Sequence, residues 1–265
     1  MTDEAKLPSV DLSRLDGHDR IVLQFSGGKD SLALLCLFKP HLHCMTVLHC
    51  DTGDQLPEIQ RLVDVTEASV PRFHRVKTDA PSWIAKHGLP SDLVPIRCHP
   101  SIANIYRETM PPIVPHTDCC AANRWTPMLT ALRELRPTLV IHGQRRTDLF
   151  GWDKTTEGDM KADLVNGWSQ WSPIADWSDD DVMAYLRSVG APILPWYSHK
   201  PHAPECATCP ASWVEGRGAY LRKHHPELAE RYAGYLSIHA EQTAPVAAQL
   251  SAEWQSLGFR KFPAG

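Results

Sequence analysis

Short apolar segments alternate with amphipathic segments along most of the chain. The pattern predicts strands over residues 21–25, 42–49, 73–77 and 138–142, and helices over residues 31–38, 57–69 and 121–136. Strands separated by helices indicate βαβ units, in which the strands are parallel and the crossovers right-handed. We therefore expect an α/β fold of the Rossmann-like kind, a parallel twisted sheet with helices on both faces.

The later part of the chain changes in character. The acidic run after Ser178 suits the start of a helix, which Ser178 would cap and Gly190 would close. A Pro/His/Cys-rich loop follows residue 195, and then a helical tail with breaks expected near Pro226 and Pro245. We expect a nucleotide-binding domain over residues 1–195. The cysteine loop and a helical C-terminal extension, residues 196–265, would pack on the same core.

The string Ser-Gly-Gly-Lys-Asp-Ser at residues 26–31 joins the first predicted strand to the first predicted helix. Such a turn directs backbone N–H groups and a helix N-terminus at one point, which suits an anion. Gly27 and Gly28 let a phosphate approach the backbone, and Lys29 adds a positive charge. The spacing is not that of a Walker A loop. The string therefore predicts a polyphosphate site of another kind.

This string resembles the PP-loop of the ATP pyrophosphatases, enzymes that split ATP into AMP and pyrophosphate while adenylating a substrate. The resemblance implies an adenine nucleotide α-hydrolase-like fold with ATP as substrate. It also implies that Asp30 orients Mg²⁺ or locks the loop, and that the departing pyrophosphate is held by Ser26, Gly27, Gly28, Lys29 and Ser31. Catalysis in such a site is mostly positioning and charge neutralisation.

Two further polar motifs follow predicted strands, Asp-Thr-Gly from Asp51 and Gly-Gln-Arg-Arg from Gly143. Ligands of parallel sheets bind at the carboxyl ends of strands, so we expect both motifs to lie beside the PP-loop. Asp51 is a candidate for contacting ribose, adenine or Mg²⁺, and alternatively a turn-forming residue. Arg145 and Arg146 are candidates for clamping the α-phosphate or an anionic second substrate, and alternatively a surface pair.

Four of the eight cysteines stand in two pairs, the adjacent Cys119 and Cys120 and the C-x₂-C of Cys206 and Cys209. A C-x₂-C motif alone is also typical of a redox dithiol, and it can arise by chance. Two pairs brought together by the fold would complete a four-thiolate site for zinc or for an iron–sulfur cluster.

The cysteine pairs, with Asp118 and Arg124, resemble the cluster-binding pattern of assimilatory adenosine phosphosulfate reductases. In that family both pairs ligate a [4Fe–4S] cluster, which implies the same for Cys119, Cys120, Cys206 and Cys209. Three other segments, residues 49–53, 143–146 and 172–178, are similar to the wider phosphoadenosine phosphosulfate reductase family and occur in the expected order. The resemblance spans roughly residues 20 to 213.

Two departures separate the chain from those reductases. They attack their substrate with a cysteine in a C-terminal Glu-Cys-Gly-x-His motif, whereas no cysteine follows Cys209 here. They also carry a degenerate phosphate loop, whereas residues 26–31 keep the full string. A hydroxyl cannot replace a thiolate nucleophile in that chemistry, so the missing cysteine speaks against sulfonucleotide reduction. The full phosphate loop points in the same direction, and both departures favour ATP cleavage.

The leading hypothesis is an AMP-forming enzyme that activates an oxygen for replacement by sulfur. By resemblance, DNA-phosphorothioation ATP pyrophosphatases and cluster-dependent tRNA thiolases are precedents, so a sulfur donor such as a cysteine desulfurase is an expected partner. The alternatives are a sulfonucleotide reductase with a relocated or partner-supplied nucleophile, the PP-loop subunit of ATP sulfurylase, and a non-catalytic cluster-bearing nucleotide sensor.

Composition narrows the class of protein and leaves the acceptor open. The 265 residues are 43% hydrophobic with a net charge of −4, which gives no basic footprint for a nucleic-acid acceptor and does not exclude one. No apolar run reaches the ~20 residues of a membrane span, and the first residues lack a signal-peptide pattern. We therefore expect a cytoplasmic protein with no membrane partner. The oligomeric state stays open, a homodimer being one option.

Overall fold

The computed structural model describes residues 10–98, 112–147, 160–211, 213 and 216–258. The chain divides into two compact units. The first unit comprises residues 1–78 and 126–205, and the second comprises residues 79–125 and 206–265. The expected division after residue 195 stays a prediction.

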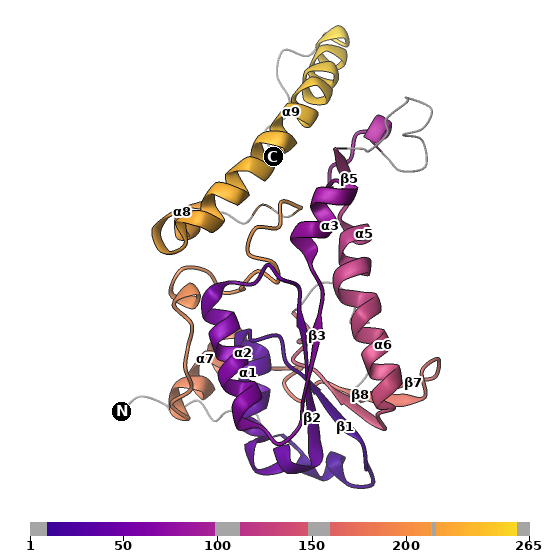
Figure 1. Cartoon of the computed structure of the whole chain (residues 1–265), viewed down its shortest axis with the longest axis vertical. Coiled ribbons are helices and arrows are strands. Elements are labelled where there is room, and N and C mark those ends of the chain that lie inside the picture. The colour runs from indigo at the N-terminus through magenta and orange to yellow at the C-terminus, as the bar shows by residue number, and fades with distance from the viewer. Residues whose placement is uncertain (1–9, 99–111, 148–159, 212, 214–215, 259–265) are drawn as a thin grey trace. The chain divides into compact units, whose positions relative to one another are not determined.

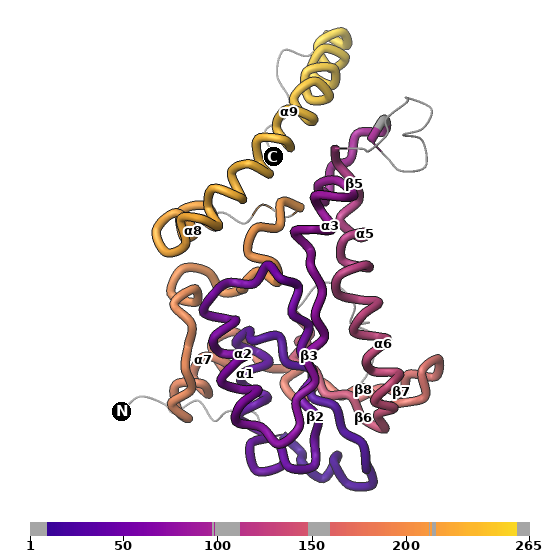
Figure 2. The backbone as a smooth tube through the Cα atoms, in the orientation of Figure 1, coloured from indigo at the N-terminus to yellow at the C-terminus, as the bar shows by residue number. Residues whose placement is uncertain are grey.

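A six-stranded sheet forms the centre of the first unit, in the order β3-β2-β1-β6-β8-β7 (Figures 1 and 2). Neighbouring strands pair in parallel except β7 and β8, which form an antiparallel hairpin. The strands are β1 (Ile21–Gln24), β2 (Met45–Asp51), β3 (Phe73–Lys77), β6 (Leu139–Ile141), β7 (Met160–Asp163) and β8 (Trp168–Trp171). This topology confirms the predicted α/β class with a mostly parallel sheet.

Helices cover both faces of this sheet, as predicted. The right-handed crossovers from β1 to β2 and from β2 to β3 carry α1 (Lys29–Leu37) and α2 (Pro57–Ser69) to one face, where α7 (Asp179–Ser188) packs on α1 (Figure 1). The chain reaches β6 from the other side of β1, so α6 (Thr126–Leu135) lies on the opposite face (Figure 1).

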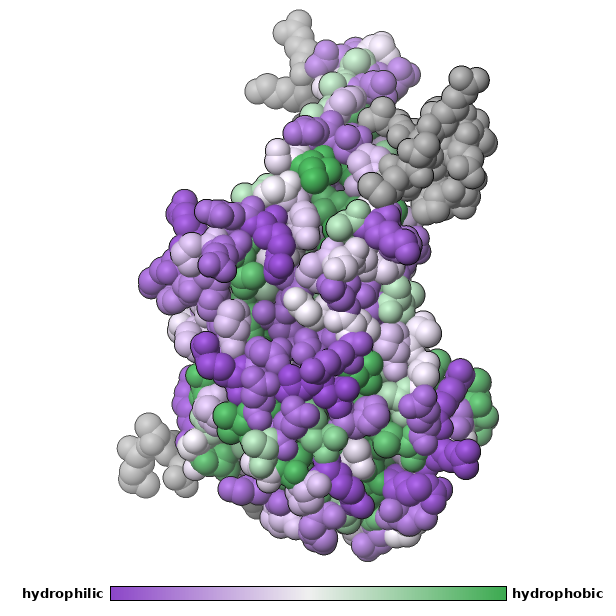
Figure 3. All heavy atoms as spheres, viewed as in Figure 1, coloured by the Kyte–Doolittle hydropathy of each residue, from purple (hydrophilic) through white to green (hydrophobic). Residues whose placement is uncertain are grey.

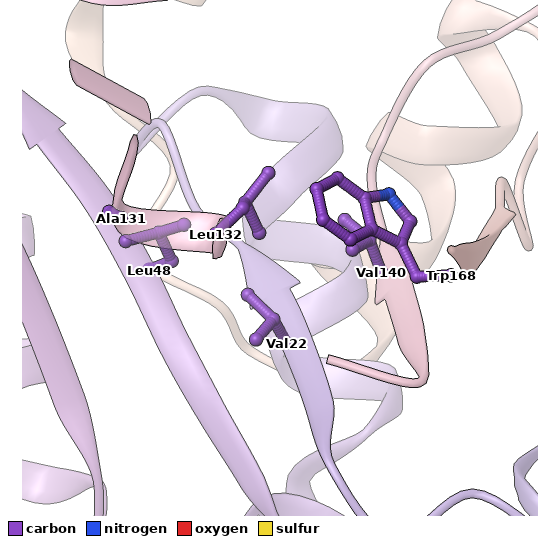
Figure 4. Close-up of a cluster of buried hydrophobic side chains, with 6 residues drawn as sticks. All are labelled: Val22, Leu48, Ala131, Leu132, Val140 and Trp168. Atoms are coloured by element: carbon purple, nitrogen blue, oxygen red, sulfur yellow. The ribbon is translucent and has the colours of Figure 1, made fainter. Parts of the chain in front are cut away.

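The core between α6 and the sheet draws one residue from each of four strands. Figure 4 shows this cluster of buried side chains, which comprises Val22, Leu48, Val140 and Trp168 with Ala131 and Leu132 of α6. Trp171 and Trp177 are also buried, and Trp171 meets Phe38 edge-on. These tryptophans therefore pack the core of the first unit.

Several predicted boundaries were wrong. The strand expected from residue 42 begins at Met45, because Pro40 starts a 3₁₀ helix over Lys39–Cys44. The helix expected from residue 121 begins five residues earlier and passes through a π-helical turn, Ala121–Trp125. The tail breaks at Pro226 as predicted, but Pro245 lies inside a continuous helix. Residues around Pro245 are exposed, and the single N–H bond lost there does not end the helix.

The second unit contains a two-stranded parallel sheet and several helices. Ala80, Ile84 and Leu89 form a small apolar core with Cys119, against which Tyr235 packs. Its elements are α3 (Ala80–His87), β4 (Leu89–Ser91), β5 (Ile113–Pro115), α5 (His116–Cys120), α8 (Arg217–His224) and α9 (Pro226–Ser256). The helices α8 and α9 confirm the predicted helical C-terminal extension.

Hydrophilic side chains cover most of the described surface in Figure 3, and apolar ones show between them in small groups. Within the described ranges, no helix combines the length and the apolar composition that crossing a bilayer requires.

Candidate functional site

The PP-loop follows β1 in a tight turn that requires glycine. Gly27 has a φ of +82°, a conformation that L side chains rarely adopt, and a Cβ there would lie 2.8 Å from Cγ2 of Ile59 on α2. Gly28 then serves as the N-cap of α1, and Lys29 is its first helical residue. The local sequence therefore produces the strand–turn–helix geometry expected of a polyphosphate site.

Three backbone amides of the loop donate hydrogen bonds to side-chain hydroxyls. The Ser26 amide donates to Oγ of Ser31 (3.2 Å), and the Gly28 amide donates to Oγ of Ser26 (3.3 Å). The shortest bond runs from the Lys29 amide to Oη of Tyr197 (2.7 Å). Tyr197 lies in a 3₁₀ helix, Pro195–Ser198, and is 168 positions from Lys29, so sequence reasoning missed it.

Two buried cations and two carboxylates form a closed ion-pair network beside the loop. Nζ of Lys29 lies 3.0 Å from Oδ2 of Asp30 and 2.8 Å from Oδ1 of Asp179. Nε of Arg145 lies 3.1 Å from Oδ1 of Asp30, and its Nη2 lies 2.9 Å from the same Oδ1 of Asp179. The side chains of Lys29 and Arg145 are only 2% and 1% exposed, whereas those of Asp30 and Asp179 are 25% and 42% exposed. Among the described residues, these four side chains contribute two positive and two negative charges.

The electrostatics keep Asp179 ionised and Tyr197 neutral. Burial alone would raise the pKa of Asp179, but the hydrogen bond and charge of Lys29, together with Arg145 and His202, lower it below its ordinary value. Burial is the main cause that raises the pKa of Tyr197 above its ordinary value. The site therefore presents a carboxylate to its two cations and an un-ionised phenol to the Lys29 amide.

The three polar motifs meet at one edge of the sheet, because β2, β1 and β6 are adjacent and parallel. The turn after β6 approaches α1 so closely that a Cβ on Gly143 would lie 3.1 Å from the carbonyl carbon of Asp30 and from the Ser31 amide nitrogen. That contact brings Arg145 into the network. The convergence predicted from the sequence is confirmed by this topology.

Asp51 and Arg146 have structural partners of their own. Oδ1 of Asp51 accepts a hydrogen bond from the Gly53 amide (3.0 Å), and its Oδ2 lies 3.6 Å from Nη1 of Arg75. Nε of Arg146 lies 2.5 Å from Oδ1 of Asp176. The turn-forming alternative for Asp51 thus has direct support. The nucleotide contacts of both residues stay predictions.

His142 directly follows β6 and precedes Gly143. Its Nδ1 lies 2.9 Å from Oγ of the fully buried Ser172. Burial, aided by the positive charge of Lys161, holds the pKa of His142 at about 4, below the ordinary 6.5 of histidine. The imidazole is therefore neutral near pH 7.

The four paired cysteines all belong to the second unit. Cys119 is 8% exposed within the apolar core, and Nδ2 of Asn123 lies 3.1 Å from its carbonyl oxygen and 3.7 Å from its Sγ. The Cys209 amide donates to the Cys206 carbonyl (3.4 Å), which closes the C-x₂-C turn. Nη1 of Arg217, a residue only 2% exposed, donates to the Cys209 carbonyl (2.5 Å).

The side-chain chemistry of these cysteines fits a metal centre, but their arrangement does not close one. Among the described residues, which include all eight cysteines, no three His, Cys, Asp or Glu side chains are grouped as a metal site requires. Cluster ligation by Cys119, Cys120, Cys206 and Cys209 therefore stays a prediction.

Asp179 belongs to the site, although the sequence predicted it only as part of a helix start. Its acidic run predicted a helix start, and the capping box between Ser178 and Asp181 confirms that interpretation. The pairing of Asp179 with Lys29 and Arg145 depends on contacts across the fold that no local pattern reveals.

Two solved structures resemble the chain with TM-scores below 0.5. One is a phosphoadenylyl-sulfate reductase from Candida auris in a phosphate complex (TM-score 0.46, 16% identity, 65% of this chain and 73% of that chain). Another is the U34-tRNA thiolase NcsA from Methanococcus maripaludis with its [4Fe-4S] cluster (TM-score 0.42, 15% identity, 86% of this chain and 75% of that chain).

Curated relatives include two adenosine 5'-phosphosulfate reductases. That of Burkholderia cepacia is 24% identical over 162 residues, which make up 61% of this chain and only 55% of that protein. That of Allochromatium vinosum is 22% identical over 241 residues, 86% of this chain and 81% of that protein. The family model described as the phosphoadenosine phosphosulfate reductase domain matches residues 20–238. With most of its length matched, the chain belongs to the phosphoadenosine phosphosulfate reductase domain family.

Proposed function

We propose that this chain is a PP-loop ATP pyrophosphatase that adenylates a substrate to prepare it for sulfur transfer. The observation that carries the proposal is the pair of buried cations, Lys29 and Arg145, beside the amide-lined turn at the N-terminus of α1. Two cations and a helix N-terminus suit a polyphosphate better than a singly charged ligand.

In the proposed reaction an oxygen of the acceptor attacks the α-phosphorus of ATP, and the bond to the β-phosphate breaks. The acceptor becomes an adenylate and pyrophosphate departs. Charge grows on the pyrophosphate as it leaves, and Lys29 with the loop amides would stabilise it. Arg145 would neutralise the α-phosphate, with Arg146 as a second candidate for that role. The remaining residues proposed for the nucleotide site are Ser26, Gly27, Gly28, Ser31, Asp51 and Gly143.

Asp30 is the proposed ligand for the Mg²⁺ that accompanies ATP. Mg²⁺ in nucleotide sites is commonly held by one or two carboxylates together with phosphate oxygens and water. Asp30 suits this role because it lies in the first turn of α1 and remains a quarter exposed.

We further propose that Cys119, Cys120, Cys206 and Cys209 hold a [4Fe–4S] cluster when it is supplied. The support is the presence of both pairs within one unit and the resemblance of their spacing to the cluster-binding pattern of adenosine phosphosulfate reductases. The sulfur would come from a donor such as a cysteine desulfurase, and a nucleic acid is one candidate acceptor.

Pyrophosphate release from ATP by anaerobically purified protein, with and without candidate DNA or RNA acceptors, tests the proposed function. We expect release from the parent protein and a loss of at least ~100-fold in Lys29→Met, of the size found when a charge-stabilising group is removed. Lys39→Met is the matched control, because Lys39 is exposed and lies outside the loop. No release under any condition would refute the pyrophosphatase and leave the reductase and the nucleotide sensor as alternatives.

A second candidate is a sulfonucleotide reductase, favoured by the curated relatives named adenosine 5'-phosphosulfate reductase. It requires a nucleophilic thiol from elsewhere in the chain or from a partner. Thiol-dependent sulfite release from adenosine phosphosulfate would support it. Absence of sulfite alongside pyrophosphate release from ATP would reject it.

A further inference from the structure

Asp179 supplies one oxygen to both buried cations of the proposed nucleotide site. Its Oδ1 lies 2.8 Å from Nζ of Lys29 and 2.9 Å from Nη2 of Arg145. That oxygen is buried between them, although 42% of the side chain is exposed. A single anionic oxygen shared by a lysine and an arginine is the arrangement that a phosphate oxygen would adopt.

Tyr197 occupies the backbone side of the same site. Its Oη accepts the Lys29 amide at 2.7 Å and would lie 3.4 Å from a Cβ placed on Gly28. The Lys29 amide is the first donor of α1, so an anion bound at this N-terminus needs it. The phenol thus holds a donor that an incoming phosphate must take over.

We propose that Asp179 and Tyr197 are an internal substitute for phosphate, which holds the PP-loop closed and neutral until a polyphosphate displaces both. The inference rests on the proposed nucleotide site. Lys29 and Arg145 are too deeply buried to remain uncompensated, so the two carboxylates balance them when no ligand is bound. Asp179 suits displacement because it belongs to another element, α7, and keeps a face toward solvent.

Displacement has a thermodynamic consequence. A ligand that must first remove an internal competitor binds with an apparent affinity reduced by the fraction of molecules in the open state. Removing the competitor should therefore tighten binding of the polyphosphate and lower the stability of the ligand-free protein, a combination that a simple loss of binding contacts would not produce.

Calorimetric titration with inorganic pyrophosphate, without metal and then with Mg²⁺, tests this inference. We expect Asp179→Asn to bind pyrophosphate about tenfold more tightly, and Tyr197→Phe about threefold more tightly, than the parent protein. Asp180→Asn and Tyr185→Phe are matched controls on α7, with the same chemical changes, and should bind like the parent. Thermal unfolding should show Asp179→Asn less stable than the parent without pyrophosphate, with most of the difference recovered when pyrophosphate is saturating.

Weaker or unchanged binding in Asp179→Asn would overturn the proposal, since Asp179 would then be a binding group or a bystander. Unchanged binding in Tyr197→Phe would remove the tyrosine from it. No pyrophosphate binding by the parent or any variant would overturn it entirely. Should Asp179→Asn unfold, Tyr197→Phe still decides whether the loop is held closed by a competing oxygen.

The outcome is separable from that of the proposed function, because pyrophosphate binding needs no turnover. Tighter pyrophosphate binding in the variants without ATP cleavage would refute the pyrophosphatase and leave the internal substitute standing. ATP cleavage by the parent, with unaltered pyrophosphate binding in both variants, would support the pyrophosphatase and refute the internal substitute.

Discussion

The PP-loop and the cysteine pairs are both recognisable in the sequence, but they differ in how far their side chains are brought together in the fold. In the loop region, Lys29 and Arg145 already share Asp30 and Asp179, and the backbone amides already meet oxygen atoms. In the cysteine region, no metal site is closed among the described residues.

The difference follows from charge. A buried lysine or arginine must find a counter-ion in the ligand-free protein, because an uncompensated charge in the interior is costly. A thiol with an ordinary pKa of about 8.5 is mostly neutral at pH 7 and behaves as a small apolar side chain, so Cys119 can pack against Ala80 and Ile84. A charged site is thus assembled in advance, whereas a thiol site need not be.

The largest expected effect concerns the cysteine pairs. Cys119→Ser and Cys209→Ser should each lose the bound iron and its visible absorbance in anaerobically purified protein, because a cluster needs all four thiolates. Cys44→Ser, in the other unit, should keep both. Pyrophosphate binding should survive in all three variants if the two regions are as independent as their chemistry indicates.

Metal analysis of the parent protein sharpens this test. Zinc at the four cysteines would contradict the cluster and its role in sulfur transfer, while leaving ATP cleavage intact. Iron retained in full by either serine variant would show that the substituted cysteine is not a ligand.

The buried imidazole of His142 should make the stability of the folded protein depend on pH. His142 has a pKa of about 4 in the folded state and about 6.5 when unfolded, so between these values the unfolded chain binds a proton that the folded one does not. Stability should fall by about 1.4 kcal/mol per pH unit as the pH drops below 6.5, about 3 kcal/mol in total.

Chemical denaturation at several pH values measures this slope. Between pH 6.5 and 4, the unfolding free energy of His142→Gln should fall less steeply with pH than that of the parent, by the slope that one bound proton produces. His41→Gln is a control, because His41 is not buried. Equal slopes in the parent and His142→Gln would contradict a buried neutral imidazole.

Gly143→Ala tests how closely the loop after β6 must approach α1. Its Cβ would lie 3.1 Å from backbone atoms of Asp30 and Ser31, which cannot move aside as a flexible side chain can. We expect a loss of about 1–3 kcal/mol in stability and weaker pyrophosphate binding. Gly218→Ala, which meets nothing within 4 Å, is the control. A stability equal to that of the parent would show that this approach is not tight.

The smallest expected effect separates two roles at the N-terminus of α7, the capping of the helix by Ser178 and the pairing of Asp179 with the two cations. Ser178→Ala removes the cap that accepts the Asp181 amide and should cost about 1 kcal/mol of stability. Pyrophosphate affinity should change far less than in Asp179→Asn, because the side chain of Ser178 bonds to Asp181 and not to either cation among the described residues. A large change in affinity would mean that the cap itself positions Asp179.

Much of the first unit could be predicted because its signals are local. The strand over Phe73–Lys77 and the helix over Pro57–Ser69 match their predicted bounds, since apolar periodicity and Pro57 act within a few residues. The hairpin of β7 and β8 was missed because Met160–Asp163 has little apolar character and its partner supplies the pairing.

The sequence by itself determined the family, the α/β class, the PP-loop and the edge of the sheet at which its partners meet. These depend on short strings and on the rule that parallel strands end together. Only the tertiary structure brought Asp179 and Tyr197 to Lys29, and among the described residues it groups the cysteine pairs into no metal site. The reason is physical, since neutralising a buried charge depends on whatever side chain the fold brings within about 3 Å, however distant in sequence.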